Sequence, residues 1–240
     1  MPSCRTPPMR TAGIDGSPAI RRSRAWRLAG LYAVTPDLAD TRDLVTRVIA
    51  ALEGGACAIQ YRNKAADPAL RLAQACALAH VHASRGGLYI VNDDAALAMA
   101  VGADGVHIGA DDGSIAAARE LVGPDRIVGV SCYDDFGRAE AAVAAGADYV
   151  AFGGFFASAT KPGARRADIG LLGRAKALGV PIVAIGGITA DNARELARAG
   201  ADAVAVISAT FDVPDVNVAA RAIVRLFEPP AGPPGAAPAT

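Results

Sequence analysis

The chain has 240 residues, so it could form one large domain or two small ones, and its length alone does not choose between them. Lys plus Arg and Asp plus Glu each number 24, which gives a net charge of zero and excludes an overall field that would attract nucleic acid or an anionic membrane. Hydrophobic residues make up 52% of the chain and aromatic residues only 5%, so the core must consist of Ala, Val, Leu and Ile, as is common in α/β proteins.

The two ends of the chain differ in composition from the part between them. Residues 1–28 are rich in Arg, Pro and Ser and lack the apolar stretch and cleavage site of a secretory signal, which indicates a mobile extension. Residues 229–240 contain so much Pro, Gly and Ala that we expect a disordered tail. Residues 29–228 are then expected to fold as a single domain, and no apolar run reaches the roughly 18 to 20 residues that a membrane span needs.

The four cysteines indicate a reducing compartment. They show no C-x-x-C spacing, and Cys57, Cys76 and Cys132 lie inside apolar segments, where a buried free thiol is expected. We therefore expect the protein to work in the cytoplasm. The residues leave open whether it forms a homo-oligomer.

One phrase recurs four times between the two ends and indicates the architecture. In each copy a glycine ends an Ala/Leu-rich helical stretch and an apolar run follows, as expected for a helix stop, a tight turn and a buried strand. The copies are GGACAIQY, VGADGVHIG, AGADYVAFG and AGADAVAVIS, starting at residues 54, 101, 145 and 199. Further apolar runs at 31–34, 88–91, 127–131 and 181–185 alternate with them, which makes eight predicted strands.

Helical stretches separate these strands. They are expected near 41–54, 67–84, 93–101, 114–122, 135–145, 168–178, 190–199 and 215–227. Strict alternation of helices with continuously apolar strands requires a parallel sheet covered by helices, and eight such units in about 200 residues predict a (β/α)8 TIM barrel. An open doubly wound sheet is the alternative, but it needs a glycine-rich phosphate turn after its first strand, and LYAVTPD contains no glycine.

The barrel topology sorts the polar residues into two groups, because ligand-binding residues of such barrels lie at the carboxyl ends of the strands. Asp104, Asp148 and Asp202 precede their strands and are therefore assigned to the opposite face, where they would hydrogen-bond turns and helix ends. Gln60, Arg62 and Lys64 follow the second strand at alternating positions. An amide, a guanidinium and an ammonium could thus converge on one polyanion, unless the segment is only a solvated loop.

Acidic pairs follow the third and fourth strands, directly after Asn92 in the first case. Asp93 or Asp94, and likewise Asp111 or Asp112, could cap the next helix, with Ser114 as a rival at the second place. Capping needs one acid per helix, and each place has two. Two carboxylates on neighbouring loops would also suit Mg²⁺, which commonly takes one or two carboxylates plus substrate phosphates. The residues alone leave both interpretations open.

The loops after the fifth and sixth strands add hydroxyl groups and a cation. Ser131 could donate to a phosphate or satisfy its own turn. The sixth strand runs into GGFFASATKPGARRAD, which carries Ser158, Thr160 and Lys161 among several glycines. Long loops on this face of a barrel are usually lids or ligand clamps, so closure over a substrate is expected.

The last two loops predict a second anion site. Gly186 and Gly187 would let backbone N–H groups approach a phosphate after the seventh strand, and Ser208 would add a donor after the eighth; a simple tight turn is the alternative. No Ser-His-acid or Cys-His arrangement appears, and His107 is expected in the core or wall rather than as a general base. A rim rich in cations and poor in bases suits departure of a phosphate-type leaving group.

Taken in order, these motifs resemble the thiamine phosphate synthase family over about residues 31–227. They are LYAVT, Q-x-R-x-K, VNDD, ADGVHIG-x-x-D, GVS, ADYVAFG with a later T-K, AIGGI and V-I-S. The resemblance implies a transferase of thiamine biosynthesis that joins 4-amino-2-methyl-5-hydroxymethylpyrimidine diphosphate to 4-methyl-5-(2-phosphoethyl)thiazole. In the implied dissociative mechanism, pyrophosphate leaves, a pyrimidine methylene cation forms, and the thiazole nitrogen attacks it.

The resemblance also implies roles for individual residues. The pyrimidine diphosphate would be held by Gln60, Arg62, Lys64, Asn92, Ser131 and Lys161. The thiazole phosphate would be held by Ser158, Thr160, Gly187, Ile207 and Ser208. Asp93 and Asp112 would bind Mg²⁺, and Arg62, Lys64 and Lys161 would be catalytic through the leaving diphosphate. The implied partners are small phosphorylated substrates, with no nucleic acid and no membrane.

Three departures from the family pattern concern substrate affinity. Ala110 stands where the family usually has Gln, Ser158 begins its T-x-T-K motif, and Ser131-Cys132-Tyr133 replaces its common S-T-H. Two alternatives remain: a thiazole tautomerase-like barrel, which uses a histidine, and a non-catalytic barrel that binds phosphorylated ligands. The intact diphosphate grip, with Tyr133 in place of a nearby His, argues against the tautomerase.

Overall fold

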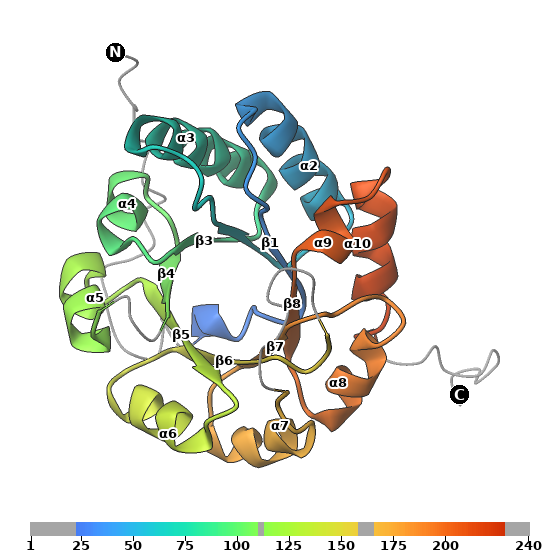
Figure 1. Ribbon diagram of the computed structural model, residues 1–240. Helices are drawn as coiled ribbons and strands as arrows, with labels where there is room; N and C mark the ends of the chain where they lie inside the picture. The colour runs from blue at the N-terminus through green and yellow to red at the C-terminus, as the bar shows by residue number, and fades with distance from the viewer. Residues whose placement is uncertain (1–22, 110–112, 158–165, 229–240) are drawn as a thin grey trace, which may run out of the picture.

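The computed structural model describes residues 23–109, 113–157 and 166–228. Eight parallel strands close into a barrel in chain order, each hydrogen-bonded to the next and β8 to β1 (Figure 1). They are β1 (Gly30–Val34), β2 (Ala58–Tyr61), β3 (Leu88–Asn92), β4 (Gly105–Ile108), β5 (Ile127–Tyr133), β6 (Tyr149–Gly153), β7 (Ile182–Ile185) and β8 (Ala203–Val206). The predicted (β/α)8 barrel is confirmed, and closure excludes the open sheet.

Helices surround the barrel and follow the predicted order. They are α2 (Thr41–Glu53), α3 (Pro68–Arg85), α4 (Ala95–Ala100), α5 (Ile115–Val122), α6 (Phe136–Ala144), α7 (Gly170–Ala175), α8 (Ala193–Ala199), α9 (Ser208–Phe211) and α10 (Val216–Val224), with the 3₁₀ turn η1 (Lys176–Leu178) after α7. The short α9 was not predicted, because a four-residue helix is too short to show a helical period.

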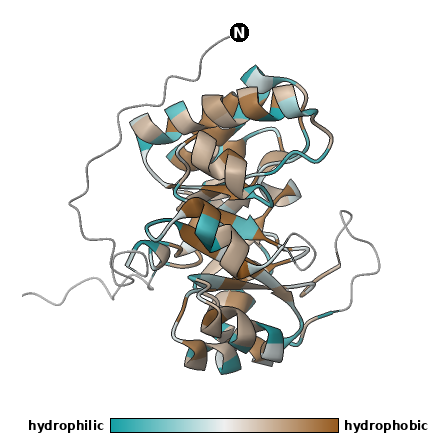
Figure 2. Ribbon diagram, turned by 90° about the vertical axis from the view of Figure 1, so that its left-hand side faces the viewer, coloured by the Kyte–Doolittle hydropathy of each residue, from teal (hydrophilic) through white to brown (hydrophobic). Residues whose placement is uncertain are grey.

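Side chains of the strands alternate between two apolar layers. One layer fills the barrel interior and includes Tyr32, Ile90, Ile127, Tyr149 and Val183. The larger layer lies between the strands and the helices. Figure 2 shows hydrophobic residues along the strands and the helix faces against them, with hydrophilic residues mainly outside. The polar residues inside the barrel therefore need a separate explanation.

Three aspartates at the amino end of the barrel have the structural role expected for them. The side chain of Asp104 accepts a hydrogen bond from Tyr89 N, that of Asp148 from Val128 N, and that of Asp202 from Ile182 N, each at 2.8 Å. Each acid thus ties the start of one strand to the start of the preceding strand. Arg119 and Lys176 pair with Asp148 and Asp202 from neighbouring helices.

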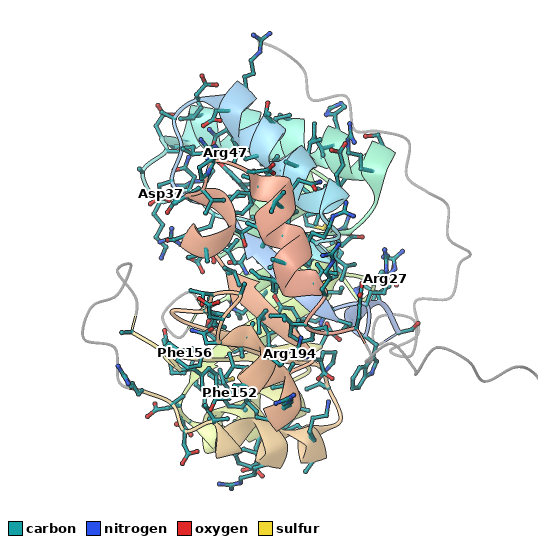
Figure 3. All side chains as sticks on the ribbon, turned by 90° about the vertical axis from the view of Figure 1, so that its right-hand side faces the viewer. Arg27, Asp37, Arg47, Phe152, Phe156 and Arg194 are labelled. Carbon is teal, nitrogen blue, oxygen red and sulfur yellow. The ribbon has the colours of Figure 1, made fainter. Side chains whose placement is uncertain are left out.

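The N-terminal segment closes the amino end of the barrel. Residues 23–25 are helical, and Ala25 and Leu28 are fully buried, Leu28 within the interior layer. Figure 3 shows Arg27 at the end of the molecule opposite to Asp37, which follows β1. The mobile extension was expected to run to residue 28, whereas the packed part of the chain already includes Ala25.

The cysteines only partly match the expectation. Cys57 and Cys132 are free thiols, and burial raises the pKa of each to about 12, so both stay protonated. Cys76 is disulfide-bonded, so the expectation of a free thiol was wrong at this position. None of the described helices is long and apolar enough to cross a membrane.

Candidate functional site at the carboxyl end of the barrel

A cavity of about 600 Å³ lies at the carboxyl ends of β2, β3 and β4. Its polar lining includes four residues predicted for the diphosphate and metal sites: Arg62, Lys64, Asn92 and Asp93. Its apolar lining includes Tyr61, Val91, Leu97, Ile108 and Leu121. The structure thus brings these four predicted residues together on adjacent loops, as the parallel topology requires.

Two residues after β1 hold the cationic segment in place and were missed by the sequence analysis. Asp37 Oδ1 accepts from Arg62 Nη1 at 3.1 Å and from Lys64 N at 2.8 Å. Thr35 Oγ1 donates to Arg62 O at 2.8 Å and accepts from Arg62 N at 2.9 Å. Both residues follow a strand at the carboxyl end, and that position alone could have identified them.

Asp93 and Asp94 divide the two roles that the sequence left open. The side chain of Asp94 accepts from Leu97 N and caps α4, so α4 begins at Ala95 rather than at 93. Asp93 instead has a φ of 62°, uncommon for a residue other than glycine, and its carboxylate lies 3.3 Å from Lys64 Nζ. A backbone conformation that costs free energy and points a carboxylate toward a cation is typical of functional sites.

The second acidic pair lies outside the described residues. Ser114 caps α5 by accepting from Ala117 N at 3.1 Å, so α5 needs neither Asp111 nor Asp112 as its cap. Within the described ranges, no group of three or more His, Cys, Asp or Glu residues could hold a metal ion. Asp93 suits Mg²⁺ as one oxygen ligand, since its side chain is 25% exposed beside the cavity. The expected pairing with Asp112 stays a prediction.

Gln60 and Ser131 lie on the inner wall of the barrel, and among the described residues neither belongs to the lining of the cavity. A continuous chain of hydrogen bonds joins them. Gln60 Nε2 donates to Tyr32 Oη, and Tyr32 Oη is hydrogen-bonded to Tyr149 Oη. His107 Nδ1 is hydrogen-bonded to Tyr149 Oη, and His107 Nε2 to Ser131 Oγ. Each of these four distances is 2.9 Å. The expectation that His107 belongs to the wall is confirmed.

Ser131 lies at an irregular point of β5. The pairing of β5 with β6 shifts register between Ser131 and Tyr133, and Tyr133 has a φ of 54° and an exposed side chain. Arg138 Nε donates to Ser131 O at 2.9 Å, and its guanidinium lies 5.8 Å from the centre of the Tyr133 ring. The residue that replaces the family's histidine therefore stands outside the barrel interior.

The two glycines after β7 lie close to the chain that follows β6. A Cβ on Gly187 would overlap the carbonyl oxygen of Ala157, and one on Gly186 would lie 2.7 Å from Gly154 N. Both have positive φ, of 64° and 108°. Close packing against the chain that follows β6 accounts for them, whereas contact with an anion stays a prediction.

The remaining predicted residues fall into two groups. Ile207 and Ser208 stand at the start of α9, directly after β8, and with Gly187 they are not part of the described lining of the β2–β4 cavity. Ser158, Thr160, Lys161 and Ala110 lie outside the described residues, as Asp112 does. Of the residues predicted for the thiazole phosphate, the structure thus describes Gly187, Ile207 and Ser208.

Comparison with known proteins adds independent findings. A family profile described as thiamine monophosphate synthase matches residues 31–210. A thiamine-phosphate synthase of Chromobacterium violaceum is 54% identical over 201 residues, covering 84% of this chain and 97% of that protein. One of Thiobacillus denitrificans is 55% identical over 199 residues, covering 82% and 94%.

Solved structures agree with the sequence matches. A thiamine phosphate pyrophosphorylase from Pyrococcus furiosus superposes with a TM-score of 0.75 at 36% identity, covering 85% of this chain and 96% of that one. A 3-hexulose-6-phosphate synthase superposes with a TM-score of 0.64 at 23% identity, covering 82% and 100%. The second match shows the fold alone.

Proposed function

Because the chain belongs to the thiamine monophosphate synthase family, it is a transferase that makes thiamine phosphate, and we propose that diphosphate leaves its substrate in the β2–β4 cavity. The proposed substrates are 4-amino-2-methyl-5-hydroxymethylpyrimidine diphosphate and 4-methyl-5-(2-phosphoethyl)thiazole. The observation that carries the assignment is the gathering of Arg62 and Lys64 around Asp37 at the cavity, with the Asp93 carboxylate beside Lys64.

In the proposed reaction the bond between the pyrimidine methylene carbon and the diphosphate oxygen breaks, and its electron pair leaves with pyrophosphate. The lone pair of the thiazole nitrogen then forms the new C–N bond. Negative charge grows on the leaving group during the first step, so fixed cations lower its barrier. Arg62 supplies a planar guanidinium that can contact two phosphate oxygens, and Lys64 supplies a point charge.

The acidic residues would serve a metal ion rather than the substrate directly. Asp93, together with Asp112, would hold Mg²⁺, which when bound would neutralise charge on the diphosphate oxygens. Asn92, at the carboxyl end of β3, would add a neutral donor to the same diphosphate. None of these steps requires a general base, which agrees with His107 being engaged in the wall.

The thiazole phosphate is proposed to bind across the barrel from the cations. Ile207 and Ser208 begin α9, and the loops after β7 and β8 often form a phosphate site with a short extra helix in such barrels. Asn192 Nδ2 donates to Gly187 O at 3.0 Å, which holds the backbone of the β7 loop in a fixed geometry. These features support the placement, and Ser158 and Thr160 are proposed to complete it.

An assay for pyrophosphate release tests the assignment. With both substrates and Mg²⁺ we expect release, and with the thiazole omitted we expect far less product. Asp93→Ala should abolish most of the Mg²⁺-dependent rate, while Asp215→Ala, which removes the cap of α10 away from the cavity, should keep it. A non-catalytic binding barrel would bind both ligands without release, and a tautomerase would convert the thiazole without the diphosphate. A cytoplasmic location stays a prediction.

A further inference from the structure

We propose that Tyr32, Tyr149 and His107 are positioning residues that fix which way the hydrogen bonds of Gln60 and Ser131 point, and thereby select a substrate ring bearing an amino group. The inference rests on the proposed function, because it assumes that Gln60 faces the pyrimidine and Ser131 faces its diphosphate side. It assigns roles to three residues that are hydrogen-bonded in series inside the barrel. They act on the ligand only through Gln60 and Ser131, the residues at the two ends of that series.

The order of donors follows from the amide at one end. Gln60 Nε2 can only donate, so Tyr32 Oη accepts from it and gives its single proton to Tyr149 Oη. Tyr149 in turn donates to His107 Nδ1, which leaves the imidazole proton on Nε2 for donation to Ser131 Oγ. Tyr32, Tyr149 and His107 then each accept one of these hydrogen bonds and donate the next, and the Ser131 proton remains available to a ligand.

The two ends present opposite characters to the ligand. Gln60 and Ser131 are the members proposed to reach it, because they form the two ends of the hydrogen-bonded series and Ser131 is only partly buried. With Nε2 turned inward, Gln60 offers an acceptor, which suits an N–H donor on the ring. Ser131 offers a donor, which suits a phosphate oxygen.

Turning the Gln60 amide over would reverse the direction of every hydrogen bond between Gln60 and Ser131. If the Gln60 amide turned over, Oε1 would accept from Tyr32, the proton order would run backwards, and Ser131 would donate to His107. A ring carrying a carbonyl in place of the amino group would favour this reversed state at Gln60, but it would leave the Ser131 oxygen facing the anionic diphosphate. The series of hydrogen bonds therefore couples the donor or acceptor group of the ring at Gln60 to the direction of the hydrogen bond at Ser131.

Close packing holds the hydrogen-bonded side chains in fixed positions and keeps the two tyrosines protonated. Tyr32 and Tyr149 are 1% and 0% exposed, and their rings meet edge to face with centres 6.1 Å apart. The His107 ring stacks on Tyr149 with centres 5.5 Å apart. Burial raises the pKa of both tyrosines, so neither loses its proton. A Cβ on Gly129 would overlap the Tyr149 ring, which explains a glycine in the middle of β5.

The test is the selectivity of variants between the 4-amino pyrimidine diphosphate and its 4-oxo analogue, measured as kcat/KM with pyrophosphate release and as Kd by calorimetry. The unaltered protein should prefer the 4-amino compound. Tyr149→Phe keeps the ring and removes the middle hydroxyl, and it should reduce the preference at least about tenfold, the worth of one oriented hydrogen bond. Tyr32→Phe, a second variant should the first not fold, should do the same by releasing Gln60.

The matched control is Tyr89→Phe, which deletes the hydroxyl of another buried tyrosine that donates to Ala75 O outside the barrel. It should lower stability similarly and leave the preference unchanged. If the chain variants lose rate equally on both compounds, or if the unaltered protein shows no preference, the positioning role is wrong while the proposed function stands. If no pyrophosphate appears but the Kd preference collapses in Tyr149→Phe, the proposed function fails and the positioning role stands.

Discussion

The two ends of the barrel use the same residue type in opposite ways. At the amino end, the side chains of Asp104, Asp148 and Asp202 accept backbone N–H groups, and Asp148 is only 2% exposed. At the carboxyl end, Asp37 and Asp93 face cations beside a cavity, with side chains 37% and 25% exposed. The difference teaches that the position of an aspartate before or after its strand, rather than its residue type, decides whether it stabilises the fold or serves the reaction.

The sharpest way to test this division is to remove a cation at the carboxyl end. Arg62→Ala should lower kcat for pyrophosphate release about 100- to 1000-fold, because a fixed charge on the leaving group is lost. The free energy of unfolding should stay within about 0.5 kcal/mol, since the ion pair with Asp37 is partly exposed and screened. Arg126→Ala is the matched control, because Arg126 donates to Ala103 O at the amino end; it should keep the rate.

The converse change is Asp148→Ala at the amino end. It leaves the Val128 N–H and the Arg119 guanidinium without this acceptor in a buried place. We expect a loss of about 3 kcal/mol in the free energy of unfolding, measured in urea, with kcat per folded molecule unchanged. A fall in kcat comparable with that of Arg62→Ala, at unchanged stability, would break the comparison between the two ends.

The sequence predicted the amino end better than the carboxyl end for a physical reason. The repeated glycine and apolar run is a local signal that located four strands, with the aspartate before three of them, and the apolar runs between the copies located the other four. The position of Asp37 after the first strand assigns it to the carboxyl end, but its pairing with Arg62 and Lys64 could not be predicted, because these partners are distant in the chain and no local pattern joins them. The Tyr32–Tyr149 contact crosses the barrel, so it depends on closure and on the register of all strands.

A smaller loss of activity should follow from removing the residue that holds Arg62 and Lys64 in position. Asp37→Ala takes away the acceptor of both Arg62 Nη1 and Lys64 N, so kcat/KM should fall about tenfold, which is one lost orienting contact. A double-mutant cycle with Arg62→Ala should show that the two losses are not additive, because both act through the same guanidinium. Additive losses would mean that Asp37 contacts the substrate by itself.

The smallest expected effect concerns pH at the amino end. Burial lowers the pKa of His82, against a weaker upward influence of Asp104, so the folded protein keeps this ring neutral. The unfolded chain takes up the proton near pH 6.5, and stability is therefore complete above that pH and declines as pH falls below it, by at most about 1.4 kcal/mol per pH unit. His82→Gln should flatten the decline measured in urea between pH 7.5 and 5.5, whereas exposed His80→Gln should not. Pyrophosphate release per folded molecule should stay equal in both variants, because His82 stacks on Tyr89 outside the barrel interior and away from the cavity.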